Sequence, residues 1–144
     1  MKLLPIDINE TLNSGFLNSP ECLEILNVYS EFYKKVGFNP PWIGYFISRE
    51  NEIVGVCGFK GKPSDNKVEI AYGTFKKYEG LGIGTEICKQ IILLSLKSDS
   101  KIKITARTLP ENNASTKILK KNNFVFSGMV HDKEDGDVWE WELL

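Results

Sequence analysis

The chain has 144 residues, of which 42% are hydrophobic and 26% charged, a composition typical of one globular domain and not of a disordered segment. Its 18 basic and 19 acidic residues are interleaved and nearly balanced, so we expect no binding of nucleic acid or of an anionic membrane. No apolar run is long enough for a signal peptide or a membrane span, which predicts a cytoplasmic protein.

Three cysteines, Cys22, Cys57 and Cys88, are scattered along the sequence. They form neither a Cys-x-x-Cys pair nor a metal-binding spacing, so we expect buried free thiols and no metal site. No internal repeat or long linker divides the chain. We therefore expect a single domain over residues 1–144.

The first third of the chain predicts a short strand at 2–6 and one helix. Ser19 is the expected N-cap and Pro20 the first helical residue, where its missing N–H costs nothing. Apolar residues then recur at helical spacing, at Cys22, Ile25, Tyr29, Phe32 and Val36. Gly37 favours a left-handed stop, and Pro40-Pro41 prevent the helix from resuming.

The rest of the chain alternates between strands and helices. The patterns predict strands at 43–48, 53–60, 67–75, 102–108, 124–130 and 138–143, and helices at 82–97 and 112–122. The last two strands pair across a turn at 132–137. Short hairpins and one strand–helix–strand crossover predict an α/β (α+β) fold, with a mixed, mainly antiparallel sheet flanked by helices on both faces.

A glycine-rich segment, Tyr78-Glu79-Gly80-Leu81-Gly82-Ile83-Gly84-Thr85, follows a predicted strand and opens a predicted helix. Glycines let backbone N–H groups approach a ligand closely, and the first helical turn offers unpaired N–H groups with partial positive charge. The spacing excludes a Rossmann fingerprint, which needs glycine at Thr85, and a P-loop, which needs Gly-Lys-Ser/Thr. Two interpretations remain: a phosphate site, or a tight turn that binds nothing.

This segment resembles the coenzyme A loop of the GCN5-related N-acetyltransferase (GNAT) family, whose pattern is Arg/Gln-x-x-Gly-x-Gly/Ala. Here Glu79 stands where Arg or Gln is usual. A second stretch, 112–124, is similar to the family's Asn-x-Ala-Ser and Glu-Lys-x-Gly-Phe motifs, especially in the branch that acetylates the N-termini of ribosomal proteins. Asn123 stands where glycine is usual, and asparagine is the next best residue for a left-handed helix stop. The resemblance covers roughly residues 43–130.

The resemblance implies that acetyl-coenzyme A is the co-substrate, that no metal is needed, and that an amine is the acceptor in a ternary complex. It implies a sheet whose fourth and fifth strands splay apart, with pantetheine hydrogen-bonded to the fourth. The implied cofactor-binding residues are Tyr72, Gly73, Thr74, Glu79, Gly80, Leu81, Gly82, Ile83, Gly84, Thr85, Asn112 and Ser115. For Asn112, the alternative is that it only caps the later helix.

Two catalytic residues are expected. Glu69 is the only carboxylate within its strand, and the family often uses a glutamate there as the general base. The alternative is a solvated glutamate, because alternation alone does not say which sheet face borders the cleft. Ser115 is the expected proton donor near the sulfur, since the family's frequent tyrosine corresponds to Leu119 here. Its alternative is a helix serine bonded back to a carbonyl.

The expected function is acetyl transfer to a primary amine. A non-catalytic module that senses acyl-coenzyme A, and a protein-interaction module, are the alternatives. The acceptor stays open among a peptide N-terminus, lysine, polyamine, aminoglycoside and small metabolite. The oligomeric state is also open, with a homodimer among the options.

Overall fold

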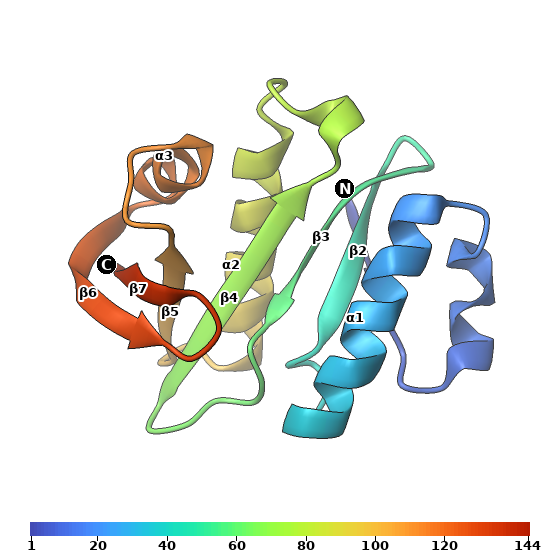
Figure 1. Ribbon diagram of the computed structural model, residues 1–144, viewed down its shortest axis with the longest axis horizontal. Helices are drawn as coiled ribbons and strands as arrows, with labels where there is room; N and C mark the ends of the chain where they lie inside the picture. The colour runs from blue at the N-terminus through green and yellow to red at the C-terminus, as the bar shows by residue number, and fades with distance from the viewer.

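A seven-stranded sheet forms the centre of the computed structural model, which describes residues 1–144. The strands are β1 (Lys2–Pro5), β2 (Gly44–Arg49), β3 (Glu52–Phe59), β4 (Lys67–Thr74), β5 (Lys103–Thr108), β6 (Phe124–Asp132) and β7 (Gly136–Leu143). They lie in the order β1-β2-β3-β4-β5-β7-β6 (Figure 1). All neighbours are antiparallel except β4 and β5, which are parallel. The predicted mixed, mainly antiparallel sheet is confirmed.

The helices cover both faces of this sheet. They are α1 (Pro20–Val36), α2 (Ile83–Ser98) and α3 (Ala114–Lys121), with two short 3-10 helices, η1 (Glu10–Phe16) and η2 (Lys76–Tyr78). Figure 1 shows α1 in front of the sheet and α2 behind it. None of the helices combines the length and the apolar character needed to cross a bilayer.

Helix α1 begins and ends as the sequence predicts. The Ser19 hydroxyl accepts a hydrogen bond from the Cys22 N–H at 3.3 Å, and Gly37 after the last turn has a φ of 86°. The Tyr33 hydroxyl donates to the Ile6 carbonyl at 2.8 Å and accepts from the Gly44 N–H at 3.0 Å. These bonds hold α1 against the first strands of the sheet.

Helix α2 packs on the opposite face. Ile87 and Ile91 have no exposed surface, and a Cβ at Gly55 of β3 would lie 2.7 Å from Ile87 Cδ1. Glycine at that position therefore lets helix and strand approach closely. All three cysteines are buried free thiols, as predicted.

Three elements differ from the predictions, since η1 and η2 were not predicted and α3 begins later than expected. Helix η1 was missed because it is short and polar; the Asn9 side chain accepts from the Thr11 N–H at 3.0 Å and starts it locally. Helix α3 begins later than expected, because Asn113 and Thr116 form a reciprocal capping box. The alternative that Asn112 caps this helix is therefore wrong. The left-handed stop at Asn123 is confirmed by its φ of 68°.

Strands β4 and β5 part along their length. They pair only from Lys67 with Lys103 to Ile70 with Ala106. The rest of β4 keeps its pairing with β3, up to Thr74 opposite Gly55. One edge of the end of β4 therefore has no strand beside it, which leaves backbone hydrogen-bonding groups there for a ligand.

Candidate functional site

A groove of about 820 Å³ lies between the end of β4, the loop before α2 and the first turns of α3. Most of the predicted binding residues line it: Tyr72, Gly73, Thr74, Glu79, Gly80, Gly82, Gly84, Thr85 and Ser115. These residues come from three separate stretches of the chain, and the fold brings them to one place.

The glycines of the loop have two different roles. Gly80 and Gly82 have φ values of 78° and 77°, and a Cβ at either position would meet no atom within 4 Å. They are required by the backbone conformation and leave the groove open. A Cβ at Gly84 would lie 2.7 Å from Ile118 Cδ1 and 3.0 Å from Thr74 Oγ1, so this glycine permits close packing of α2 against α3.

The N-terminus of α2 faces the groove without a side-chain cap. The N–H groups of Ile83, Gly84 and Thr85 donate to no protein group. From the other wall, Lys117 and Lys121 of α3 line the groove, and neither forms an ion pair. Unpaired amides, a helix N-terminus and two lysines together suit an anion such as a diphosphate.

Sequence reasoning did not single out Lys117 and Lys121. The signal was present, because residues four apart lie on one face of a helix. They also follow Ser115, which was expected to face the ligand. Their positive charge stands opposite Glu79, which occupies the position where the family pattern has Arg or Gln.

Three predicted binding residues lie outside the lining of the groove. Leu81 is exposed, Ile83 is buried in the core under the loop, and both border a separate hollow with Glu86. Asn112 is also exposed and lies at a hollow between α3 and the aromatic residues of β6 and β7. Neither Ile83 nor Asn112 lines the groove.

Two hydroxyl groups meet at the inner end of the groove. The Tyr72 hydroxyl donates to the Ser115 carbonyl at 3.1 Å, and the Ser115 hydroxyl donates to the Tyr72 oxygen at 3.4 Å. Ser115 therefore does not bond back to its own helix. Burial raises the pKa of Tyr72 well above its ordinary value of 10.0, so the phenol keeps its proton at neutral pH. Tyr72 was expected to bind the cofactor, and no role had been expected for its hydroxyl.

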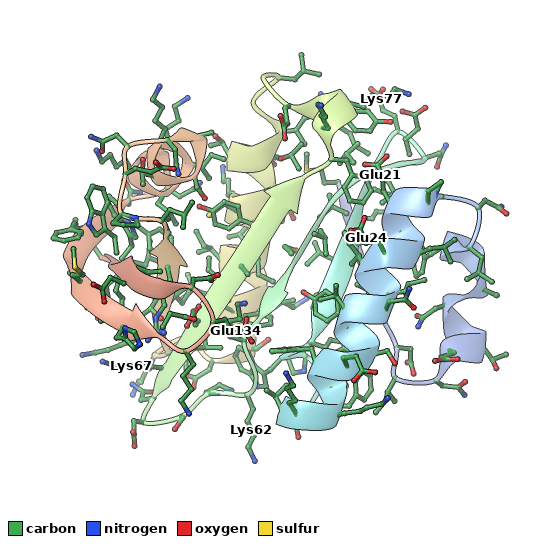
Figure 2. The ribbon with its side chains drawn as sticks, in the orientation of Figure 1. Glu21, Glu24, Lys62, Lys67, Lys77 and Glu134 are labelled. Carbon is green, nitrogen blue, oxygen red and sulfur yellow. The ribbon has the colours of Figure 1, made fainter.

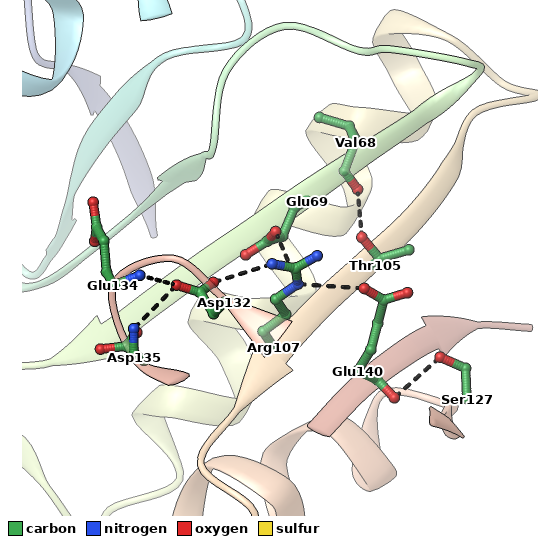
Figure 3. A network of polar contacts seen from close by, with 9 residues as sticks. All are labelled: Val68, Glu69, Thr105, Arg107, Ser127, Asp132, Glu134, Asp135 and Glu140. Atoms are coloured by element: carbon green, nitrogen blue, oxygen red, sulfur yellow. Dashed lines mark hydrogen bonds and ion pairs between the residues drawn. The ribbon is translucent and has the colours of Figure 1, made fainter. Parts of the chain in front are cut away.

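Glu69 lies in a charged cluster around Arg107 (Figure 3). Its Oε1 is 3.6 Å from Arg107 Nε. The same guanidinium contacts Asp132 Oδ2 at 3.1 Å and Glu140 Oε2 at 3.3 Å. Three carboxylates thus share one arginine, and the cluster carries net negative charge. Arg107 was missed by sequence reasoning, although a charged residue inside a predicted strand is a usable signal.

The pKa of Glu69 follows from this position. Desolvation by burial raises it above its ordinary value of 4.5, and the positive charges of Arg107 and Lys60 offset part of the rise. The neighbouring carboxylates of Asp132 and Glu140 raise it further. A carboxyl group whose pKa is moved up toward neutrality is a better proton acceptor than a free glutamate.

The gap between β4 and β5 begins between the two groups of residues along β4. Successive side chains of a strand point to opposite faces, so Glu69 and Tyr72 lie on different faces of the sheet. The last pair before the strands part is Ile70 with Ala106, one residue beyond Glu69 and its partner Thr105. A ligand that passes through this gap from the groove would emerge beside Glu69.

Comparisons with known proteins agree with this geometry. The family model described as Acetyltransferase (GNAT) domain matches residues 16–125. The uncharacterized N-acetyltransferase p20 of Bacillus licheniformis is 29% identical over 104 residues, which cover 68% of this chain and 58% of that protein. The chain therefore spans little more than half the length of that relative.

Two solved structures share the fold. A single-residue variant of the spermidine N-acetyltransferase SpeG from Vibrio cholerae has a TM-score of 0.72 at 14% identity, covering 100% of this chain and 95% of that one. The ribosomal L7/L12 α-N-protein acetyltransferase RimL in complex with coenzyme A has a TM-score of 0.66 at 18% identity, covering 86% and 71%. At these identities the likeness concerns the fold alone.

Proposed function

Because this chain belongs to the acetyltransferase (GNAT) family, we propose that it transfers an acetyl group from acetyl-coenzyme A to a primary amine. The observation that carries the proposal is the gap between β4 and β5. The gap begins one residue after Glu69, a carboxylate of raised pKa that lines a hollow, and the unpaired end of β4 lines a groove suited to a diphosphate.

In this proposal the groove holds the coenzyme. The free N–H groups of Ile83, Gly84 and Thr85 bind the diphosphate. Lys117 and Lys121 add positive charge on the other wall. The unpaired edge at the end of β4 bonds to the pantetheine as a further strand would. A fold neighbour, RimL, has been solved with coenzyme A, which supports this choice of ligand.

The chemistry follows from the residues on either side of the gap. The amine nitrogen attacks the thioester carbonyl carbon, a C–N bond forms, and the C–S bond breaks. Glu69 accepts the proton that the amine loses, directly or through one water. Backbone N–H groups near Tyr72, Gly73 and Thr74 stabilise the oxyanion of the tetrahedral intermediate. The coenzyme A thiolate then takes a proton from the Tyr72–Ser115 hydroxyl pair. A proton from solvent replaces the one that the pair has lost.

The second candidate function is that of a sensor, which binds acyl-coenzyme A and does not catalyse a reaction. The raised pKa of Glu69 favours the enzyme, because a protein that only binds acyl-coenzyme A does not require a partly buried carboxylate beside the gap.

A titration with acetyl-coenzyme A tests the function first. At about 100 times the Kd, acetyl-coenzyme A should raise the Tm by roughly 10 °C. Thiol release with a panel of primary amines then separates enzyme from sensor. Absence of any Tm shift at high excess contradicts both cofactor-binding functions, and binding without thiol release for every amine leaves the sensor.

Tyr72→Phe tests the proton donor. The substitution keeps the ring and removes the hydroxyl that bonds to Ser115, so we expect kcat to fall about 10-fold to 100-fold, with the KM for acetyl-coenzyme A nearly unchanged. Steady-state thiol release measures both. Tyr45→Phe is the matched control, since its hydroxyl bonds to the Pro41 carbonyl away from the groove. An unchanged kcat in Tyr72→Phe would show that the thiolate leaves without this donor.

A further inference from the structure

The hollow at Glu69 is lined by both basic and acidic residues. Its volume is about 410 Å³, within the size range of small-molecule sites. Its lining includes Lys60, Lys62 and Lys67, and we call these three residues the lysine lip. The lining also includes Glu69 and Glu140, together with Arg107.

The lysine lip is held in place by the backbone. The Lys60 N–H donates to the Glu69 carbonyl at 2.9 Å, which puts the lip directly beside the expected base. The loop closes through two backbone bonds between Ser64 and Lys67, at 2.9 and 3.0 Å. Asp65, at the tip of this loop, does not line the hollow.

None of the three lysines has an acidic partner. Each is exposed, and none has a carboxylate oxygen within 4.0 Å of its ammonium group. Figure 2 shows Lys62 and Lys67 at the same end of the molecule. Their charges are therefore available to a ligand, and the charge of Lys60 already acts on Glu69.

The acidic residues around Arg107 have the opposite character. Arg107 is shared by Glu69, Asp132 and Glu140 (Figure 3), so one positive charge faces three negative ones. An ammonium group is attracted there, whereas an anion is attracted to the lysine lip.

Resting on the proposed function, we propose that the acceptor is a small amine that also carries an anionic group, a carboxylate or a phosphate. Its amine lies at Glu69 beside the gap, and its anionic group lies at the lysine lip. A polyamine would bring a second positive charge to three unpaired lysines. The lip therefore selects against the acceptor of SpeG, the spermidine N-acetyltransferase whose fold this chain shares.

A matched set of amines tests this acceptor class. The probes are γ-aminobutyrate, its neutral amide, putrescine and aminopropyl phosphate, with shorter and longer homologues of each. Calorimetry on protein saturated with coenzyme A measures binding, and thiol release with acetyl-coenzyme A measures turnover. We expect at least one anionic amine to bind about 10-fold more tightly than the diamine of the same length. Added salt should reduce the difference, because it screens the lip.

Charge-reversal substitutions in the lysine lip provide a second test of the acceptor class. Lys62→Glu and Lys67→Glu should each weaken binding of the anionic amine about 10-fold and improve binding of the diamine. Lys97→Glu is the control, because Lys97 is an exposed residue in the last turn of α2 that lines none of the hollows described. It changes the net charge equally and should leave the preference unchanged.

Three results overturn the acceptor class. They are a diamine that binds as tightly as the anionic amines, a preference that survives both reversals, and no binding by any member of the set. If the protein binds acetyl-coenzyme A and acetylates the diamine fastest, the proposed function stands and the proposed acceptor class is wrong. If the protein does not bind acetyl-coenzyme A, the proposed function itself is wrong.

Discussion

Gly82→Val is expected to weaken acetyl-coenzyme A binding about 100-fold, because two or more charged hydrogen bonds are lost at once. Gly82 has a φ of 77°, which a β-branched residue adopts only under strain. The loop would relax to another conformation, and the N–H groups of Ile83 and Gly84 would no longer point at a common anion. The new side chain would also stand in space that is now open. Isothermal calorimetry with acetyl-coenzyme A measures the Kd.

Gly136→Val separates this effect from loss of stability. Gly136 lies at the start of β7 with a φ of 72°, and a Cβ there also meets no atom within 4 Å. Both variants carry the same strain, so their Tm values should fall by a similar amount. Only Gly82→Val should lose affinity. Wild-type affinity in Gly82→Val would mean that the loop does not hold the phosphates.

Glu69→Gln is expected to lower kcat by roughly 10²–10⁴-fold, because the amide cannot accept the proton of the amine. The side chain keeps its size, and Glu69 does not line the coenzyme groove. The Kd for acetyl-coenzyme A should therefore stay within about 2-fold of wild type, since no contact to the coenzyme changes. Pre-steady-state thiol release separates the chemical step from binding.

The pH profile gives an independent check on Glu69. A base works only when deprotonated, and burial raises its pKa above 4.5. The kcat/KM of the wild type should therefore fall as the pH drops through this raised pKa, at a pH above 4.5. Glu69→Gln should lack this fall.

Glu142→Gln is the control for both measurements. Glu142 lies on β7 opposite Thr105, so the same isosteric change occurs on a nearby strand. It forms no ion pair and lines none of the hollows described. Its kcat, and the fall of its kcat/KM at low pH, should match those of the wild type. If Glu69→Gln also matches the wild type, Glu69 has no part in proton transfer.

Local patterns determined most of the secondary structure and the glycine-rich loop before α2. The start of α1 at Ser19 and Pro20, the stop at Asn123 and the glycine run from Gly80 to Gly84 are each set by neighbours in sequence. Capping, positive φ and strand alternation act over a few residues, so the sequence displays them directly. Helix η1 was not predicted, because its N-cap at Asn9 is not followed by an apolar stripe at helical spacing.

The arrangement of the candidate site was decided by tertiary structure. Arg107 meets Glu69 and Asp132, and Tyr72 meets Ser115, across separations of 25 to 43 residues in the chain. No local pattern encodes which of these side chains share a face. The pairing of the strands decides it, because Glu69 lies one residue before the last β4–β5 pair, whereas Tyr72 lies beyond that pair and points to the opposite face.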